Sequence, residues 1–236
     1  MTTIIFDVDD TLYDQALSFH ETFKQLINDT YSYDQMDRIY RASRKHSETL
    51  FDQSERGEIT VLDWQVGRYK LALQDFGIDI NDDLALEFHD QYKRAQGKIT
   101  LFPEVETLLD FLKTKDVTLA ILTNGEVAHQ SMKIDQLQLE KWIPKENTFI
   151  SGAYGIAKPN PEIFHIIENQ LPTTPESTIY VGDSLEKDIV GAKQVGWQAV
   201  WMNHRQRQAD PACSYTADQE VTSAEELRAY FTQRMK

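Results

Sequence analysis

Residues 3–11 read TIIFDVDDT, an apolar run that ends in three aspartates within four residues. The apolar half is typical of a strand that is buried on both faces of a sheet. Carboxylates this close together repel one another, so some feature of the folded protein has to offset their charge. A turn open to water, a bound cation, or a reaction that uses two acids would each do so.

The composition is that of an ordinary globular protein. Of its 236 residues, 41% are hydrophobic and 26% are charged, and the formal net charge is −14. This negative charge, with no basic stripe to offset it, argues against a partner that is a nucleic acid or an anionic membrane. Cys213 is the only cysteine, which excludes an internal disulfide and a paired-cysteine metal site.

The chain shows no targeting pattern. It does not open with a basic segment followed by a long apolar stretch, and it lacks the run of roughly 18 apolar residues that a membrane span needs. We therefore expect a cytoplasmic protein, present as a monomer or a homodimer.

Short apolar runs alternate with helical patterns through the second half of the chain. Besides residues 3–6, strands are expected at 117–122, 148–150, 178–181 and 199–202. Helices are expected at 104–115, 127–139, 161–170, 185–195 and 224–235. This alternation predicts an α/β fold, a Rossmann-like parallel sheet with helices on both faces.

Residues 14–99 have a different pattern. Helices are expected here at 17–29, 33–51, 61–76 and 84–95, with no strand between them. An all-helical block that follows the first strand of a parallel sheet is best interpreted as an insertion. We therefore divide the chain into a core domain, residues 1–13 and 100–236, and an inserted helical cap domain, residues 14–99.

Polar groups and glycines follow four of the predicted strands. In an open parallel sheet, ligands bind beyond the carboxyl ends of the strands. The segments at this edge are 7–11 (DVDDT), 123–125 (TNG), 157–159 (AKP) and 182–184 (GDS), with Asp188 one helical turn beyond the last. Each of them is also compatible with a plain turn or a helix cap, such as Asn160 before Pro161. Their common position predicts that they converge on one crevice.

The order of these segments resembles the motifs of the haloacid dehalogenase (HAD) superfamily of phosphatases. Those motifs are D-x-D-x-T, then Thr or Ser, then Lys, then G-D-x(3,4)-D. Here they stand as Asp7-Val8-Asp9-Asp10-Thr11, Thr123, Lys158, and Gly182-Asp183 with Asp188. The resemblance covers the whole chain, because a helical cap inserted after the first strand is a feature of one large subgroup.

The resemblance implies a Mg²⁺-dependent phosphomonoester hydrolase that works through an aspartyl-phosphate. Asp7 would be the nucleophile, and Asp9 would be the general acid and base. The side chains of Asp7 and Asp183 and the backbone carbonyl of Asp9 would hold Mg²⁺. Asp188 would stand behind these ligands and orient a bound water or Lys158.

The resemblance also implies how the phosphate is held. Thr123 and Lys158 would act in catalysis, and phosphate oxygens would be bound by Thr123, Asn124, Gly125 and Lys158.

The number of acids in these motifs calls for a metal ion. Two carboxylates about 4 Å apart repel by roughly 4 kcal/mol at an effective dielectric of 20. Four carboxylates with a single lysine are therefore unbalanced, and a divalent cation is expected.

A narrower resemblance, to the pyrimidine 5′-nucleotidases of this superfamily, concerns the substrate. It rests on residues 51–60 (FDQSERGEIT), on residues 200–204 (VWMNH), and on Asp10, where many relatives carry glycine. It implies that the partner is a small-molecule phosphomonoester such as UMP, dUMP, dTMP or a noncanonical analogue. Arg56 lies in an expected loop of the cap and is a candidate substrate contact; the alternative is an exposed arginine.

Other functions remain open. A phosphatase of sugar phosphates or phosphoglycolate would share every core residue and differ in the cap, and a phosphomutase would return the phosphoryl group to its substrate. A 2-haloacid dehalogenase is disfavoured, because Asp9 and the acids Asp183 and Asp188 favour phosphoryl chemistry. A non-catalytic phosphate-binding regulator is disfavoured, because no catalytic position is substituted.

Overall fold

The computed structural model describes residues 1–235, and it describes Glu55 by its backbone alone. The chain divides into two compact units: Met1–Asp14 with Thr100–Lys236, here called the sheet unit, and Gln15–Ile99, the helical unit. The sequence pattern assigns Asp14 to the inserted block, whereas the structure places it in the sheet unit, where its carboxylate pairs with Arg205. Among the described helices, none combines the length and the apolar character that crossing a membrane requires.

The sheet unit is built on a six-stranded parallel sheet with the strand order β3-β2-β1-β4-β5-β6. The strands are β1 (Thr2–Phe6), β2 (Val117–Thr123), β3 (Thr148–Ile150), β4 (Thr178–Gly182), β5 (Gln198–Met202) and β6 (Gln219–Val221). The first strand lies in the middle, with Ile5 paired to Ala120 of β2 and to Tyr180 of β4. The predicted α/β fold is confirmed.

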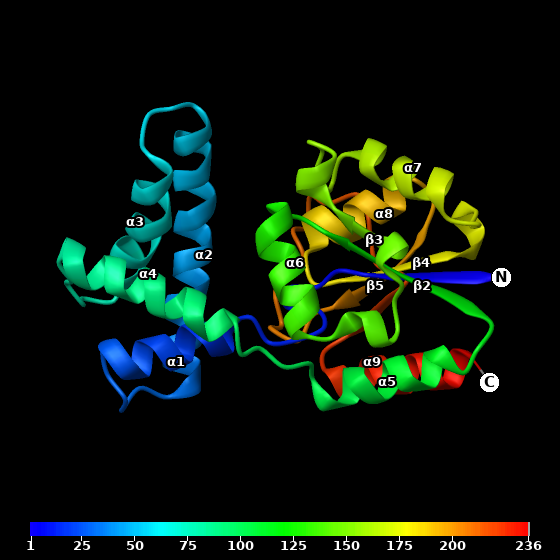
Figure 1. The fold of residues 1–236 in the computed structure, drawn as a ribbon, viewed down its shortest axis with the longest axis horizontal. Coiled ribbons are helices and arrows are strands. Elements are labelled where there is room, and N and C mark those ends of the chain that lie inside the picture. The colour runs from blue at the N-terminus through cyan, green and yellow to red at the C-terminus, as the bar shows by residue number, and fades with distance from the viewer. Residues whose placement is uncertain (236) are drawn as a thin grey trace. The chain divides into compact units, whose positions relative to one another are not determined.

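Helices cover both faces of this sheet (Figure 1). They are α5 (Pro103–Lys113), α6 (Val127–Gln136), α7 (Pro161–Gln170), α8 (Val190–Gln194) and α9 (Ala224–Arg234). On one face α5 and α9 lie side by side, and α7 and α8 pack together on the other. Successive side chains of β1 serve the two faces: Phe6 packs against Phe231 of α9, whereas Ile5 joins the core cluster that contains Phe164 of α7.

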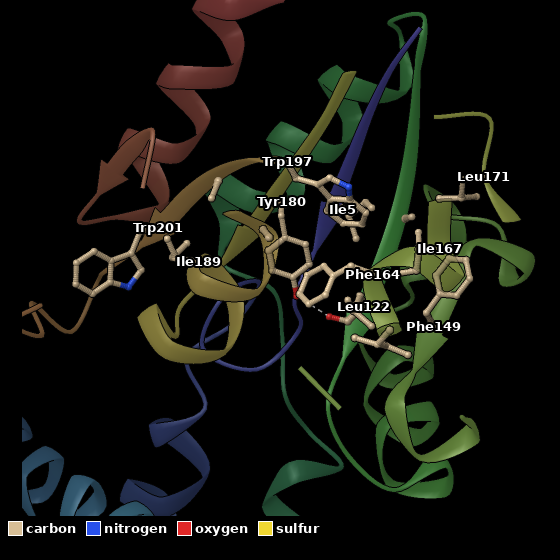
Figure 2. Close-up of a cluster of buried hydrophobic side chains, with 14 of the residues drawn as sticks. Ile5, Leu122, Phe149, Phe164, Ile167, Leu171, Tyr180, Ile189, Trp197 and Trp201 are labelled. Carbon is tan, nitrogen blue, oxygen red and sulfur yellow. Dashed lines mark hydrogen bonds between the residues drawn. The ribbon is translucent and has the colours of Figure 1, made fainter. Parts of the chain in front are cut away.

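An aromatic cluster fills the α7 side of the sheet (Figure 2). The ring of Phe164 meets those of Trp197 and Tyr180 edge to face, with centroids 5.3 and 5.9 Å apart, a favoured geometry for aromatic pairs. The polar groups of Trp197 and Tyr180 are both hydrogen-bonded. Trp197 Nε1 donates to Glu168 at 2.7 Å, and the Tyr180 hydroxyl donates to the carbonyl of Leu122 at 2.9 Å. The core therefore fixes a phenol hydroxyl close to the carboxyl ends of β2 and β4.

Two elements of the sheet unit differ from the predictions. Strand β6 is not expected from the sequence, because its three residues, QEV, carry a single buried side chain, that of Val221. The helix predicted at 185–195 begins as a π-helical turn, Leu185–Ile189, before α8 continues it. In this wide turn the Ile189 N–H donates to the carbonyl of Ser184 at 3.2 Å.

The helical unit contains α1 (Ala16–Leu26), α2 (Tyr33–Glu55), α3 (Val61–Gln74) and α4 (Asp82–Gln96). Capping boxes start α2 at Ser32 and α3 at Thr60, and the Asn81 side chain caps α4. The core of this unit is aromatic: the ring of Phe19 lies 5.2 Å from that of Phe88 and 5.7 Å from that of Tyr40. Helix α2 runs four residues past the expected end at Phe51, because no helix breaker occurs before Gly57.

The substitution Gly191→Ala is expected to destabilise the protein, although alanine forms helices better than glycine does. A Cβ at Gly191 would lie 2.6 Å from Phe164 Cε2 and 3.3 Å from the Cα of Pro159. Overpacking of this kind costs about 1–3 kcal/mol of the free energy of unfolding, measurable by urea denaturation. Adding Phe164→Leu should recover part of the loss.

The matched control is Gly67→Ala in α3, where the nearest atom to the added Cβ is the flexible Leu50 Cδ1, 3.3 Å away. This control should leave stability unchanged or raise it. Equal stability of Gly191→Ala and the wild type would contradict the close packing of α7 on α8.

Candidate active site

The carboxyl ends of three adjacent strands form the base of the candidate site. Strand β1 lies between β2 and β4, so the segments that follow these strands emerge next to one another. Asp7 directly follows β1, and its N–H donates to the carbonyl of Val181 in β4 at 2.8 Å. Thr123 is buried at the end of β2, and Asp183 follows the last residue of β4.

A buried lysine joins these strand ends. Lys158 Nζ donates to Asp7 Oδ1 at 2.8 Å, to Asp188 Oδ1 at 2.7 Å and to the Tyr180 hydroxyl at 2.8 Å. It also reaches the carbonyl of Leu122 at 3.2 Å. Burial lowers the pKa of Lys158, but the carboxylates of Asp188 and Asp7 outweigh it and raise that pKa above its ordinary value. Lys158 is therefore a permanent cation inside the protein, not a solvated surface residue.

The turn after β2 positions this lysine. The Asn124 side chain donates to the carbonyl of Lys158 and accepts from its N–H, both at 3.0 Å. The N–H of Gly125 donates to Ser151 Oγ, also at 3.0 Å. The phosphate-binding roles expected of Asn124 and Gly125 stay predictions, and in this structure the Asn124 side-chain amide and the Gly125 N–H have partners within the protein. The Asn124 side chain ties the loop that carries Lys158 to the end of β2.

Three carboxylates meet beside the lysine. Asp7, Asp183 and Asp188 each offer one oxygen, and these oxygens all lie within 4.8 Å of one another. Gly182 permits this approach, since a Cβ there would lie 2.5 Å from the Cβ of Asp188. The second oxygen of Asp188 accepts from the Ser184 N–H at 2.9 Å. Asp188 is thus held between the lysine and the start of the π-helical turn.

The charges of this cluster are not balanced by the protein alone. Burial is the largest cause that raises the pKa of Asp7, from its ordinary value of 3.8 to about 7, and Asp188 and Asp9 add to it while Lys158 opposes it. Burial likewise raises the pKa of Asp183 well above its ordinary value, against the effect of Arg207. Clustered carboxylate oxygens with raised pKa values fit a hard divalent cation, because oxygen ligands are what Mg²⁺ prefers.

The Asp9 side chain contacts a different set of residues from those around Asp7. Both of its oxygens accept from Lys133 Nζ at 2.8 Å, Oδ2 also accepts from Gln130 at 3.0 Å, and Oδ1 also accepts from the Tyr13 hydroxyl. Burial raises the pKa of Asp9, but Lys133, Gln130 and Tyr13 together lower it below its ordinary value. These contacts favour the carboxylate form of Asp9, the form that accepts a proton.

Two arginines after β5 extend the site. Arg207 Nη1 lies 2.9 Å from Asp183 Oδ2. Arg205 contacts Asp10 through two hydrogen bonds of 2.9 and 2.6 Å and also pairs with Asp14 at 2.5 Å. Burial raises the pKa of Asp10, but the hydrogen bonds and charges of its neighbours, Arg205 among them, lower it well below its ordinary value. The carboxylates at this edge therefore have more cations around them than the single lysine counted from the sequence.

Sequence reasoning missed four polar residues of this region: Gln130, Lys133, Arg205 and Arg207. A signal for each is present in the sequence. Arg205 and Arg207 follow the predicted strand at 199–202, so the rule that points to strand ends applies to them as well. Gln130 and Lys133 are three residues apart in the predicted helix at 127–139, which puts them on one face.

Arg56 lies in the helical unit, just after α2. Its exposed side chain donates to Glu58 at 2.6 Å and again at 3.1 Å. A contact between Arg56 and a substrate stays a prediction. Two aromatic residues of the same unit, Tyr40 and Tyr69, are each 2% exposed and pack in its core.

Comparison with known proteins gives several phosphatases. The chain is 32% identical to phosphoserine phosphatase of Thermus thermophilus over 55% of this chain, and it spans about half, 51%, of the length of that relative. It is 29% identical to N-acylneuraminate-9-phosphatase of Homo sapiens, over 85% of this chain and 82% of that one. It is 27% identical to pyrimidine 5′-nucleotidase YjjG of Escherichia coli, over 95% of each chain.

A solved structure and a family model agree with these relatives. The HAD-hydrolase YfnB of Bacillus subtilis, solved bound to magnesium, is 26% identical, with a TM-score of 0.70 over 97% of each chain. A model of haloacid dehalogenase-like hydrolases matches residues 1–196. Because that match runs from the first strand to the turn before β5, the chain belongs to the haloacid dehalogenase-like hydrolases, and the resemblance carried by its motifs is confirmed.

Proposed function

We propose that this protein is a Mg²⁺-dependent phosphomonoester hydrolase that forms an aspartyl-phosphate on Asp7. The observation that carries the proposal is the position of Asp7, whose carboxylate is bound to buried Lys158 and clustered with Asp183 and Asp188. The similarity to three phosphatases along the chain, and to a solved relative that binds magnesium, supports it.

In this mechanism, each side chain of the cluster has one task. Lys158 fixes one oxygen of Asp7 and offsets the negative charge of the incoming phosphate. Asp7 attacks phosphorus with its carboxylate. Asp7, Asp183 and the backbone carbonyl of Asp9 would hold Mg²⁺, with Asp188 behind them holding Lys158. The metal, when bound, neutralises the carboxylates and polarises the phosphoryl group.

Asp9 is proposed to handle the protons. It would give a proton to the leaving oxygen in the first half of the reaction and take one from the attacking water in the second. A dehalogenase of this fold would not need this second acid. A phosphomutase would also use it, so release of inorganic phosphate is what separates hydrolysis from mutase activity.

We propose a pyrimidine nucleoside monophosphate as the substrate and the helical unit as the cap that selects it. The support is the similarity to a pyrimidine 5′-nucleotidase over nearly the full length of both chains, helical unit included. The second candidate is a sugar phosphate or phosphoglycolate, favoured by the similarity to N-acylneuraminate-9-phosphatase.

Replacing the nucleophile should stop turnover. We expect Asp7→Asn to lower kcat for phosphate release by roughly 10⁴-fold or more, the scale on which loss of a nucleophile acts in other hydrolases. The fold should survive, because the amide replaces a carboxylate that carries unfavourable burial in the protein. The matched control, Asp116→Asn at an exposed position before β2, should keep wild-type activity. Phosphate release by purified Asp7→Asn near the wild-type rate would reject the nucleophile.

Mg²⁺ should stabilise the protein, and more so at pH 8 than at pH 5. The folded-state pKa of Asp7 is raised from 3.8 to about 7, so the stability it contributes is present below about pH 4 and is lost as the pH rises through 7. A cation that binds the deprotonated acids restores it above pH 7, whereas at pH 5 it has to displace protons. At 100 times its Kd, Mg²⁺ should add about 2.7 kcal/mol, or roughly 5–10 °C in Tm.

Calorimetric melting with Mg²⁺, and with KCl at matched ionic strength, measures this effect. The KCl sample should show no comparable shift at either pH. A Mg²⁺ shift of the same size at both pH values would contradict a metal site built on Asp7. Chelation with EDTA should also abolish phosphate release.

A substrate screen tests the leaving group. With Mg²⁺ present, kcat/KM for UMP, dUMP and dTMP should exceed that for sugar phosphates and phosphoglycolate by about tenfold or more, since stacking on a base contributes about 1–3 kcal/mol. The reverse order would overturn the nucleotidase proposal and leave the phosphatase proposal intact.

A further inference from the structure

We propose that Lys133 is a positioning residue: it anchors the Asp9 side chain for the second half of the reaction, in which water releases phosphate from Asp7. This inference rests on the proposed phosphatase function and adds to it a residue that acts only through Asp9. The observations that carry it are the burial of Lys133, its contact with both Asp9 oxygens, and the number of donors around that carboxylate.

Lys133 is a buried cation with one partner. Its side chain is 1% exposed, and among the described residues its hydrogen bonds go to the two oxygens of Asp9, each at 2.8 Å. Lysine is rarely buried unless it is paired, because removing an ammonium group from water is costly. An apolar residue such as methionine would fill this place in α6 without that cost. The ammonium group therefore serves the carboxylate that it contacts.

The other cations of the site have different partners. Lys158 contacts Asp7 and Asp188, Arg205 contacts Asp10 and Asp14, and the closest pairing of Arg207 is with Asp183. Lys133 is thus not shared among the acids of the site but is paired with Asp9. Its loss would leave Asp9, rather than the metal-binding cluster, without its cation.

Donors surround the Asp9 side chain on both of its oxygens. An ionised carboxylate offers about four acceptor sites. Lys133 fills one on each oxygen, Tyr13 fills a second on Oδ1, and Gln130 fills a second on Oδ2. A carboxylate in this setting has to give up one donor before water can approach it. Tyr13 and Gln130 are neutral donors and Lys133 is charged, so a neutral one gives way more easily and Lys133 stays as the anchor.

The step that follows is balanced. The water oxygen bonds to phosphorus, the bond between phosphorus and Asp7 breaks, and Asp7 leaves as a carboxylate. One water proton passes to Asp9, whose side chain Lys133 holds in place. In the first half of the reaction Asp9 donates to the leaving oxygen the proton that it took from water in the preceding turnover.

Pre-steady-state kinetics of Lys133→Met tests the proposal, with p-nitrophenyl phosphate and Mg²⁺. This substrate has a leaving group that needs little protonation, so formation of the phospho-enzyme should stay fast. We expect a burst of p-nitrophenol close to one per enzyme, followed by a steady-state rate lowered by roughly 100-fold, the cost of a misplaced catalytic group. Rapid quenching should trap the phospho-enzyme, and it should accumulate.

Two further variants isolate the role of the ammonium group. Lys145→Met removes an exposed lysine that pairs with Glu140, and it should behave as wild type. Lys133→Gln keeps a donor of similar length without the charge, and it should show the same burst; it also serves if the methionine variant does not fold. In an Asp9→Asn background, Lys133→Met should add little further loss, because Lys133 acts through Asp9.

The outcomes separate this inference from the proposed function. If the wild type releases phosphate and both Lys133 variants turn over at its rate, or slow down without a burst, the positioning role is overturned while the phosphatase stands. If Lys133→Met lowers the rate of Asp9→Asn as much as that of the wild type, Lys133 does not act through Asp9. A folded wild type that forms no phospho-enzyme overturns both.

Discussion

A buried ammonium group, that of Lys158, holds the centre of the sheet unit in one arrangement. It contacts Asp7 after β1, the carbonyl of Leu122 in β2 and the hydroxyl of Tyr180 in β4. A charge in this position is tolerable only with carboxylates beside it, and those carboxylates repel one another unless the lysine stays between them. The lysine and the acids therefore require each other, and the aromatic core that fixes Tyr180 supports both.

The topology of the sheet makes this mutual dependence possible. Because β1 is the central strand, residues that follow β1, β2 and β4 meet although 176 positions separate Asp7 from Asp183. Local chemistry then sets the distances. Gly182 leaves room for Asp188, and the π-helical turn after Ser184 turns that side chain back toward the strand ends. A regular α-helix from 185 onward, as the sequence pattern predicts, would not include this wider turn.

Much of the fold follows from patterns that the sequence shows directly. The apolar runs predict β1 to β5, and of the polar groups expected at their ends, Asp7, Lys158, Asp183 and Asp188 lie together. What the sequence does not show is the pairing of charges. Arg205 and Arg207 lie in an irregular segment, and Lys133 looks like the polar side of an amphipathic helix until its contact with Asp9, after β1, is known. Likewise, the pattern cannot show that the Asn124 side chain pairs with the backbone of Lys158 or that the Gly125 N–H pairs with Ser151.

The three aspartates of residues 7–10 illustrate how one short segment carries two different electrostatic states. Asp10 is held ionised by Arg205, and Asp9 is held ionised by Lys133, so the pKa of each is lowered. Asp7 shares Lys158 with Asp188, and its pKa is raised to about 7. One lysine shared by two buried carboxylates does not offset the cost of burying both charges. The effect is a raised pKa at Asp7, the residue proposed as nucleophile. The neighbours are paired with cations of the chain itself, and this difference is what the proposed metal site at Asp7 and Asp183 builds on.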